Sequence, residues 1–317
     1  MIYTIALAGS TTHTLLCAET LLRNTNFKIS WIMTPTPKIL GRKQLLTKNP
    51  LHLFAEKNHF QHFLIDQSIT NTTQQQFHNQ NIAHPDFLLV VDFGYLVPDW
   101  LLRWPIYSAL NIHPSLLPRW RGSSPGQFVL LYGEKKSAVT LMTMSQGLDT
   151  GDILYQEEFT VEPTWTQKEY YQKSFHSISQ VFAQKILDFA EKKILPHPQP
   201  IVSPTLMARR LKKEDGFVAW DVLSNSLHNK EIKETATSQL LREVHSGIKK
   251  WPVVIAQATR AFSPWPTLWT LIQTAKGEKR MQIVQSTVSE TGNLLLEKVK
   301  IEGEVTTEWE NAQKTVI

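Results

Sequence analysis

The sequence of 317 residues contains one cysteine, no long apolar run and no leader-like start. The cysteine, Cys17, excludes a disulfide bond within the chain and fits a reducing compartment. No apolar stretch approaches the roughly 20 residues that a helix needs to span a bilayer, so we expect no membrane segment. The first nine residues resemble a strand and a turn, and they lack the basic region of a secretory signal. These absences favour a globular protein of the cytoplasm.

The sequence also lacks the usual motifs of a dinucleotide site and of a metal site. Gly9 is isolated after the first apolar run, and no Gly-x-Gly-x-x-Gly follows it. His59 and His62 are close in sequence, but no cysteine cluster and no His-Glu-x-x-His accompanies them. We therefore predict neither a bound dinucleotide nor a metal ion.

Strand and helix patterns alternate over the amino-terminal part. The expected strands are 2–8, 28–33, 87–93, 106–112 and 138–144, and the expected helices are 14–23, 50–58 and 167–192. Such alternation predicts an α/β fold with a Rossmann-like, mostly parallel sheet that helices cover on both faces.

Four prolines within 195–204 indicate extended chain, so we place a linker at 193–208. The length of the chain is typical of two domains, and the linker separates a domain of residues 1–192 from a smaller one of residues 209–317. In the second domain, the β-like runs 217–220, 281–286 and 293–301 predict a small barrel, and 224–250 reads as helical and exposed.

Three polar residues, Asn111, His113 and Asp149, form the candidate site. Alternation along the expected strand places Asn111 and His113 on one face, about 7 Å apart along the chain. Pro114 removes a backbone donor and should end the strand, so both residues lie at the carboxyl edge of the sheet, where open α/β folds bind ligands. Asp149 lies in a glycine-rich turn. Each residue alone has an ordinary structural explanation, but an amide, an imidazole and a carboxylate together fit acyl transfer to an amine.

Positive charge is in excess, with a net charge of +5, and it is clustered. The clusters are Lys38, Arg42, Lys43 and Lys48 in a stretch without acidic residues, Arg119 and Arg121 after the site strand, and Arg209, Arg210, Lys212 and Lys213 after the linker. Such clusters fit a polyanionic partner, although a solvated basic face explains any one of them equally well.

The longest motif, Asn111-Ile-His-Pro-Ser-Leu-Leu-Pro118, is followed later by Leu148-Asp-Thr-Gly151. Both resemble the catalytic motifs of formyltransferases that use 10-formyltetrahydrofolate, and Arg119-Trp-Arg-Gly122 narrows the resemblance to the methionyl-tRNA formyltransferase family. Further similar segments are 5–9, the loop at 41–42, 89–98, 211–215 with Trp220, and 260–266. The resemblance covers most of the chain.

This resemblance implies transfer of the formyl group from the folate to the amino group of methionine on initiator tRNA, for translation initiation. It implies that Asn111 donates a hydrogen bond to the formyl oxygen, that His113 holds this oxygen or relays a proton, and that Asp149 orients His113 and accepts a proton. It further implies an OB-like second domain that binds tRNA. We also expect a monomer without a metal ion.

The same resemblance implies two sets of binding residues. The folate-binding set is Phe93, Gly94, Tyr95, Leu96, Val97, Pro98, Ser115, Leu116, Leu117 and Pro118, with Asp149. The tRNA-binding set is Arg42, Lys43, Arg119, Arg121, Arg209 and Arg210. The chain differs from the family pattern at Ser10-Thr-Thr-His13, in the less basic loop 41–45, at Asp92 and in the additional stretch 224–250.

Two alternatives remain open from the sequence. One is a formyltransferase that acts on a nucleotide-linked amino sugar, which would share the three catalytic residues and the folate pocket; a purine-pathway transferase would have no use for the last hundred or so residues. The other is a catalytically idle RNA-binding homologue. Asn111, His113 and Asp149 argue against the idle protein. The string at 117–122, the basic loop at 41–45 and the expected barrel with its motif at 262–266 argue against the sugar enzyme.

Overall fold

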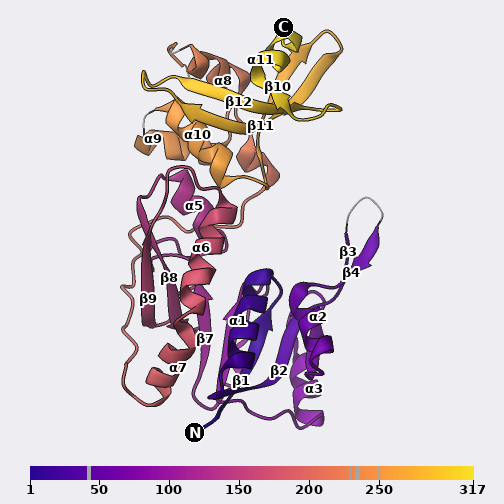
Figure 1. Cartoon of the computed structure of the whole chain (residues 1–317), viewed down its shortest axis with the longest axis vertical. Coiled ribbons are helices and arrows are strands. Elements are labelled where there is room, and N and C mark those ends of the chain that lie inside the picture. Colours follow the sequence, from indigo (N-terminus) through magenta and orange to yellow (C-terminus); the bar gives the residue numbers. More distant parts are fainter. Residues whose placement is uncertain (41–43, 229, 233–235, 249) are drawn as a thin grey trace. The chain divides into compact units, whose positions relative to one another are not determined.

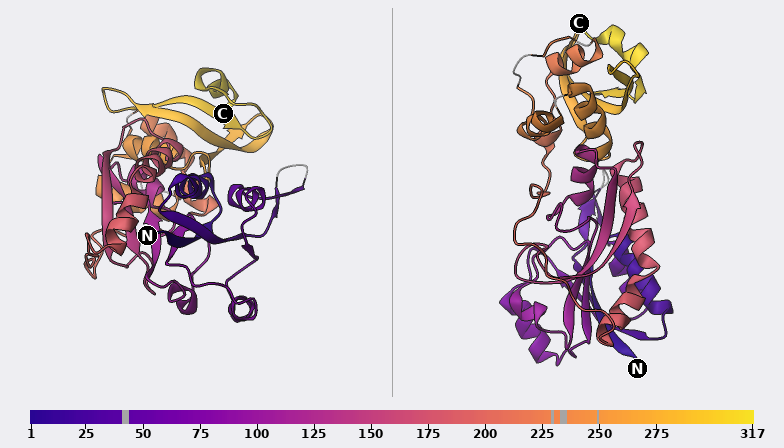
Figure 2. Two further views of the ribbon diagram at one scale, coloured as in Figure 1. Left: turned by 60° about the horizontal axis from the view of Figure 1, so that its bottom comes forward. Right: turned by 90° about the vertical axis from the view of Figure 1, so that its left-hand side faces the viewer.

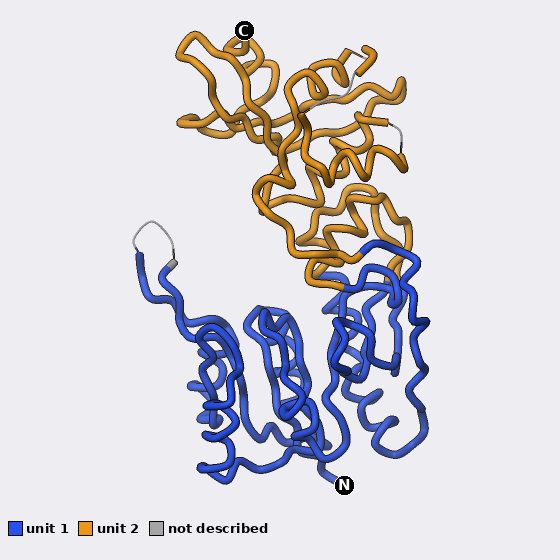
Figure 3. The backbone as a smooth tube through the Cα atoms, turned by 180° about the vertical axis from the view of Figure 1, so that it is seen from behind, with its two compact units in different colours: residues 1–121, 138–158, 172–206 blue, residues 122–137, 159–171, 207–317 orange. Residues whose placement is uncertain are grey.

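The structure is a computed structural model, and it describes the chain except residues 41–43, 229, 233–235 and 249. The described chain divides into two compact units (Figure 3). Unit 1 contains residues 1–121, 138–158 and 172–206, and unit 2 contains residues 122–137, 159–171 and 207–317. Two short stretches that precede the expected linker therefore group with the carboxyl-terminal part.

A seven-stranded sheet, which lies mainly in unit 1, carries the candidate site (Figure 1). In spatial order its strands are β5 (His62–Ile65), β2 (Phe27–Pro35), β1 (Tyr3–Gly9), β6 (Phe87–Val91), β7 (Ser108–His113), β8 (Lys136–Thr143) and β9 (Ile153–Thr160). The neighbours from β5 to β7 pair in parallel, and β8 is antiparallel to β7. The predicted α/β fold with a mostly parallel sheet is confirmed.

Helices cover both faces of this sheet (Figure 2). They are α1 (Thr12–Arg23), α2 (Pro50–Lys57), α3 (Asn71–Asn79), α4 (Asp99–Leu102), α6 (Gln167–Ser179) and α7 (Phe182–Ala190), and a small hairpin pairs β3 (Lys38–Leu40) with β4 (Leu45–Thr47). The prediction of a single helix over 167–192 is wrong, because α6 ends at Ser179 and α7 begins at Phe182. The Ser177 and Ser179 hydroxyls donate to carbonyl oxygens three residues earlier, and such bonds compete with a regular helix.

The first strand and helix meet at a turn that only glycine fits. Ile5 and Leu7 of β1 are fully buried. A Cβ atom on Gly9 would lie 2.3 Å from the carbonyl oxygen of Val91, so a larger residue would separate β1 from β6. Thr11 then caps the amino-terminal end of α1, because its hydroxyl accepts hydrogen bonds from the amides of His13 and Thr14.

The order of the strands reverses between β1 and β6. After β1 the chain moves to β2 and β5 on one side, and it returns to β6 and then β7 on the other. In open α/β sheets, ligands bind beyond the carboxyl ends of the strands at such a reversal. The strand order therefore predicts a ligand site next to the ends of β1, β6 and β7.

Unit 2 contains a four-stranded antiparallel sheet with helices. Its elements are β10 (Leu268–Thr274), β11 (Gly277–Val288), β12 (Leu294–Ile301), β13 (Thr307–Glu308), α5 (Pro125–Leu131), α8 (Trp220–Leu227), α9 (Gln239–Ile248), α10 (Trp251–Ala261), α11 (Trp309–Ala312), η1 (Lys213–Gly216) and η2 (Gln313–Thr315). The expected run 281–286 lies in β11, and the run 293–301 matches β12 except for its first residue. The run 217–220 is not a strand, and Trp220 begins α8. Among the described helices, none has the length and apolarity needed to cross a membrane.

Candidate active site

Strand β7 delivers the first two site residues, as expected. Its pairing ends with His113, directly before Pro114, and Asn111 lies between Val90 of β6 and Met142 of β8. The intervening Ile112 is 2% exposed and packs in the core. Alternation along the strand thus directs Asn111 and His113 to the other face from the apolar residues.

His113 and Asp149 come together at this edge. The His113 Nδ1 atom lies 3.6 Å from the Asp149 Oδ2 atom, and their side chains are 6% and 11% exposed. The separation is slightly longer than a direct hydrogen bond, and catalytic hydrogen bonds often tighten only when substrate binds. An imidazole and a carboxylate that face each other at this distance can share or relay one proton.

Asp149 is presented by a closed loop between β8 and β9. The backbone amide of Thr143 donates to the carbonyl oxygen of Asp152 at 2.9 Å, and the amide of Asp152 donates to the Thr143 hydroxyl at 3.0 Å. Gly151 is required because a Cβ atom there would lie 1.8 Å from the Thr143 carbonyl oxygen. Asp149 itself has a φ of +53°, a left-handed conformation that aspartate tolerates better than most residues.

A second contact fixes the proton on His113. Its Nε2 atom lies 3.1 Å from the carbonyl oxygen of Trp120. A carbonyl oxygen only accepts hydrogen bonds, so Nε2 carries a proton and donates it. In the neutral ring the Nδ1 lone pair therefore faces Asp149, which suits His113 to receive a proton on that side.

A small cavity of about 130 Å³ adjoins these groups. It is lined by Val90, Phe93, Tyr95, Leu96, Val97, Asn111, Met142, Met144, Ser145, Gln146, Gly147, Leu148 and Asp149. A second cavity of about 530 Å³ shares Tyr95, Leu96, Val97 and Gln146 with it and also touches Gly94 and Pro98. The second volume lies in the range of about 300–1,000 Å³ that is typical of small-molecule sites.

The structure separates the two predicted folate segments. Residues 93–98 all line one or both cavities, beside Asn111 and Asp149. Residues 115–118 line neither cavity, and Ser115 and Leu117 are almost fully buried. Their carbonyl oxygens accept hydrogen bonds from Thr140 and Gln156, so this segment shapes the backbone after His113.

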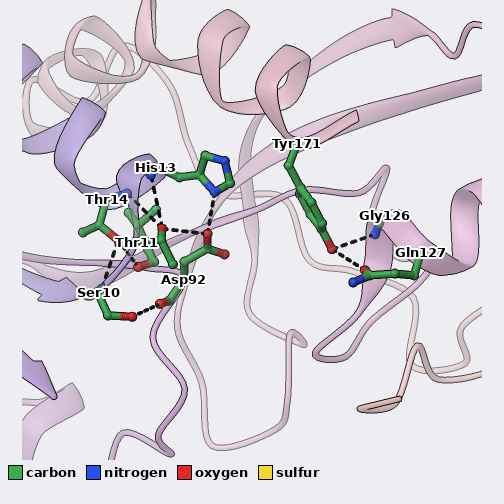
Figure 4. Close-up of polar contacts among 9 residues, drawn as sticks. Ser10, Thr11, His13, Thr14, Asp92, Gly126, Gln127 and Tyr171 are labelled. Atoms are coloured by element: carbon green, nitrogen blue, oxygen red, sulfur yellow. Dashed lines mark hydrogen bonds and ion pairs between the residues drawn. The ribbon is translucent and has the colours of Figure 1, made fainter. Parts of the chain in front are cut away.

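His13 and Asp92, two residues at which the chain differs from the family pattern, contact each other. The His13 Nδ1 atom lies 2.7 Å from an Asp92 carboxylate oxygen, to which the Thr11 hydroxyl also donates at 2.9 Å (Figure 4). Asp92 has a φ of +47°, and the next residue, Phe93, lines the smaller cavity. His13 also stacks on Phe175, with ring centroids 4.2 Å apart. The changes at positions 10–13 and 92 therefore form one cluster between the ends of β1 and β6.

The predicted RNA-contacting residues fall into different environments. Arg42 and Lys43 lie outside the described residues. Arg119 is half-buried, with its guanidinium 5.9 Å from the centre of the Trp120 ring. Arg121 is only 7% exposed and donates to Gln199 and to two carbonyl oxygens, so little of it is accessible to RNA.

The two arginines that follow the linker also differ. Arg209 donates to both carboxylate oxygens of Asp215, at 2.8 and 2.7 Å, and this hydrogen bonding raises the pKa of its guanidinium. Its neighbour Arg210 is exposed. Only Arg210 of this pair therefore has its full charge available to a phosphate.

Three side chains of types that bind metal ions lie close together elsewhere, on α2 and β5. His52, Glu56 and His62 bring their ligand atoms within 4.8 Å of one another; the sequence predicted no metal ion, and it noted His62 only beside His59. The Lys48 ammonium already donates to both Glu56 oxygens, at 2.6 and 2.8 Å. Burial lowers the pKa of His52, so its ring is neutral at physiological pH. A cation would have to displace Lys48.

Sequence reasoning missed several residues of the site. Met142 and Met144 line the smaller cavity, and strand alternation from Asn111 across the β7–β8 pair could have identified Met142. Gln146 also lines it and donates to Asp99 of α4, next to the predicted folate loop. Gln199 contacts the Asp149 loop from the proline-rich segment, and no local pattern marks it.

The formyl transferase family model matches residues 2–186, which cover the seven-stranded sheet and the site described above. This match spans more than half of the chain, and the chain belongs to the formyl transferase family. The family match agrees with the resemblance that the motifs at 111–122 and 148–151 indicated.

Among curated relatives, the chain is similar to proteins named methionyl-tRNA formyltransferase. It is 37% identical to the protein of Ehrlichia ruminantium (strain Welgevonden) over 158 residues, which are 50% of this chain and 51% of that protein. It is 33% identical to the protein of Rickettsia bellii (strain RML369-C) over 216 residues, 67% of this chain and 68% of that protein. The chain thus spans about half the length of the first curated relatives it matches.

Solved structures share the fold at low sequence identity. Methionyl-tRNA formyltransferase from Clostridium thermocellum has a TM-score of 0.53 at 15% identity, covering 95% of this chain and 99% of that chain. The N-formyltransferase from Helicobacter canadensis, solved with folinic acid and dTDP-3-aminofucose, has a TM-score of 0.56 at 18% identity, covering 91% and 88%. These similarities support the architecture.

Proposed function

We propose that this protein transfers the formyl group of 10-formyltetrahydrofolate to the amino group of methionine esterified to initiator tRNA. The observation that carries the proposal is that Asn111 and Asp149 line one cavity, with His113 facing Asp149 at 3.6 Å and the loop 93–98 lining this cavity and the larger one. We propose methionyl-tRNA as the acceptor because the curated relatives are named methionyl-tRNA formyltransferase. The larger cavity supplies room for the ring system of the donor.

In the proposed reaction, the methionine nitrogen attacks the formyl carbon, and the carbonyl π electrons move to the formyl oxygen. The Asn111 amide donates a hydrogen bond to this oxyanion, an interaction that strengthens as the negative charge develops. His113 and Asp149 accept the proton that the nitrogen loses, directly or through water. The bond between the formyl carbon and N10 then breaks, and N10 takes up a proton as tetrahydrofolate leaves.

The carboxyl-terminal unit is our candidate for contact with the tRNA. Its antiparallel sheet and exposed Arg210 support this role, and we propose that the sheet belongs to an OB-like domain. Arg42 and Lys43 remain proposed contacts to the acceptor end. We further propose that the protein works as a monomer in the cytoplasm.

A direct assay tests the proposed activity. Purified protein is incubated with 10-formyltetrahydrofolate and methionyl initiator tRNA, and formyl-methionine is measured after hydrolysis of the ester. A parallel reaction replaces the tRNA by an amino-sugar nucleotide. We expect product with the tRNA alone; formylation of the sugar alone would transfer the proposal to that substrate, and no product with either acceptor would refute it.

A further inference from the structure

Gln199 joins the loop that carries Asp149 to a buried arginine. It lies between Pro198 and Pro200 in the proline-rich segment after α7. Its side-chain oxygen accepts hydrogen bonds from Arg121 Nε at 3.1 Å and Nη2 at 2.9 Å. Its side-chain nitrogen donates to the carbonyl oxygens of Asp149 at 3.1 Å and Gly151 at 2.6 Å. One side chain therefore makes four hydrogen bonds between two segments.

These four hydrogen bonds require the amide group of glutamine. A guanidinium only donates, so the group that faces Arg121 must accept; a backbone carbonyl only accepts, so the group that faces Asp149 and Gly151 must donate. The orientation of the Gln199 amide is thereby fixed. A carboxylate at this position would satisfy Arg121 but would place an oxygen against two carbonyl oxygens.

Arg121 is itself held firmly. It is 7% exposed, and it also donates to the carbonyl oxygens of Ile201 at 3.3 Å and Pro200 at 2.8 Å. The preceding residue, Trp120, supplies the carbonyl oxygen that binds His113, and its amide donates to the Thr205 hydroxyl at 2.8 Å. The segment 199–205 therefore supports both the residue that orients His113 and the loop that presents Asp149.

We infer that Gln199 is a positioning residue for formyl transfer, which fixes the Asp149 carboxylate relative to the His113 imidazole through its hydrogen bonds to Arg121 and to the Asp149 loop. This inference rests on the proposed function of the His113–Asp149 pair. It also gives Arg121 a role other than RNA contact. Support of this kind matters because a displacement of about 1 Å in a catalytic group can reduce the rate by about 100-fold.

The test is the substitution Gln199→Glu, which preserves the size of the side chain and an acceptor for Arg121. We expect kcat to fall by about 100-fold, while KM for the donor and for the tRNA changes by less than about threefold. We also expect faster hydrogen–deuterium exchange of the backbone amides of residues 145–152, measured without substrates. Gln180→Glu is the matched control, since Gln180 is exposed and its side-chain nitrogen donates to the hydroxyl of its sequence neighbour Ser179.

Each outcome decides between a positioning role and a structural one. A lower melting temperature with unchanged kcat per folded molecule would overturn the inference, and so would unchanged kcat with unchanged exchange. If the wild-type protein formylates neither acceptor, the proposed function fails, and the exchange experiment alone then decides. In that case faster exchange of 145–152 in Gln199→Glu supports the contact, and unchanged exchange contradicts it.

Discussion

In two regions of this molecule, a histidine or an arginine faces an aspartate, and the distance between the nitrogen and oxygen atoms differs between the two pairs. At the edge of the parallel sheet, His113 and Asp149 are 3.6 Å apart beside a cavity. In the segment after the linker, Arg209 and Asp215 form two hydrogen bonds of 2.8 and 2.7 Å. In the proposed reaction the looser pair exchanges a proton with the substrate, whereas the tighter pair binds within the protein and suits a structural role.

Asp215 illustrates the structural type. Burial by itself raises the pKa of its carboxyl group, but hydrogen bonds from Arg209 and from the Lys212 amide, with the charges of both residues, outweigh burial and leave the pKa lowered. A lowered pKa in the folded state means that ionised Asp215 stabilises the fold above the unfolded pKa. This contribution is lost as the pH falls through the folded pKa.

The largest loss of activity is expected from a substitution of Asn111, which lines the cavity beside the His113–Asp149 pair. Asn111→Ala removes the proposed oxyanion donor and should lower kcat by about 100- to 1,000-fold, since the loss of one such donor costs roughly 3–4 kcal/mol of barrier. Formylation of methionyl-tRNA at saturating donor measures this effect. The matched control is Asn79→Ala at the exposed end of α3, which should retain full activity. Equal activity of the two variants would remove Asn111 from the mechanism.

A substitution in the Arg209–Asp215 pair is expected to have a smaller effect, which changes the stability of the fold and leaves kcat unchanged. Asp215→Asn weakens the bonds to Arg209 and should lower the free energy of unfolding at pH 7 by about 1–3 kcal/mol. Urea unfolding of both proteins measures this difference. The kcat of the folded variant should stay at the wild-type value.

The same variant has a defined pH dependence. Because the native pKa of Asp215 lies below its unfolded value, the stability difference should be complete at neutral pH and should shrink as the pH falls below about 4. Unfolding at pH 7 and at pH 3 makes the comparison. A difference of constant size at both pH values would show that the charge of Asp215 is not responsible.

The smallest effect distinguishes the two neighbouring arginines. Arg210→Ala should reduce the slope of log affinity against log salt by about 0.7–0.9, the value for one lost phosphate contact, without changing the melting temperature. Arg209→Ala should lower the melting temperature, since it leaves Asp215 buried without its guanidinium partner. Filter binding of methionyl-tRNA between low and physiological salt measures the slopes. Identical slopes for Arg210→Ala and wild type would exclude a phosphate contact by Arg210.

The sequence predicted the parts of the site that depend on neighbours along the chain. Alternation in β7 and the break at Pro114 are local, so the places of Asn111 and His113 followed from the residues themselves. The loop 93–98 followed from the resemblance, and Asp149 followed from its glycine-rich turn together with the resemblance; in the structure these residues line the two cavities, and their roles remain predictions.

The remaining features depend on contacts between distant segments. Gln199 bonds to Arg121 across 78 residues, and His13 bonds to Asp92 across 79, so no periodicity reveals either pair. The environments of the arginines could not be predicted either, because the burial of Arg121 and the ion pair of Arg209 arise only when the chain folds. The division of the expected helix 167–192 reflects serine hydroxyls that bond to their own helix.

A double-mutant cycle tests most directly whether His113 and Asp149 act as one catalytic unit. Formylation of methionyl-tRNA is measured for His113→Ala, Asp149→Ala and the double variant, each checked for native folding. Residues that act together lose their effect together, so the double variant should be no more than a few-fold slower than the slower single variant, on the order of the non-additivity seen in other catalytic units. Losses that multiply, or a single variant with wild-type turnover, would contradict the account.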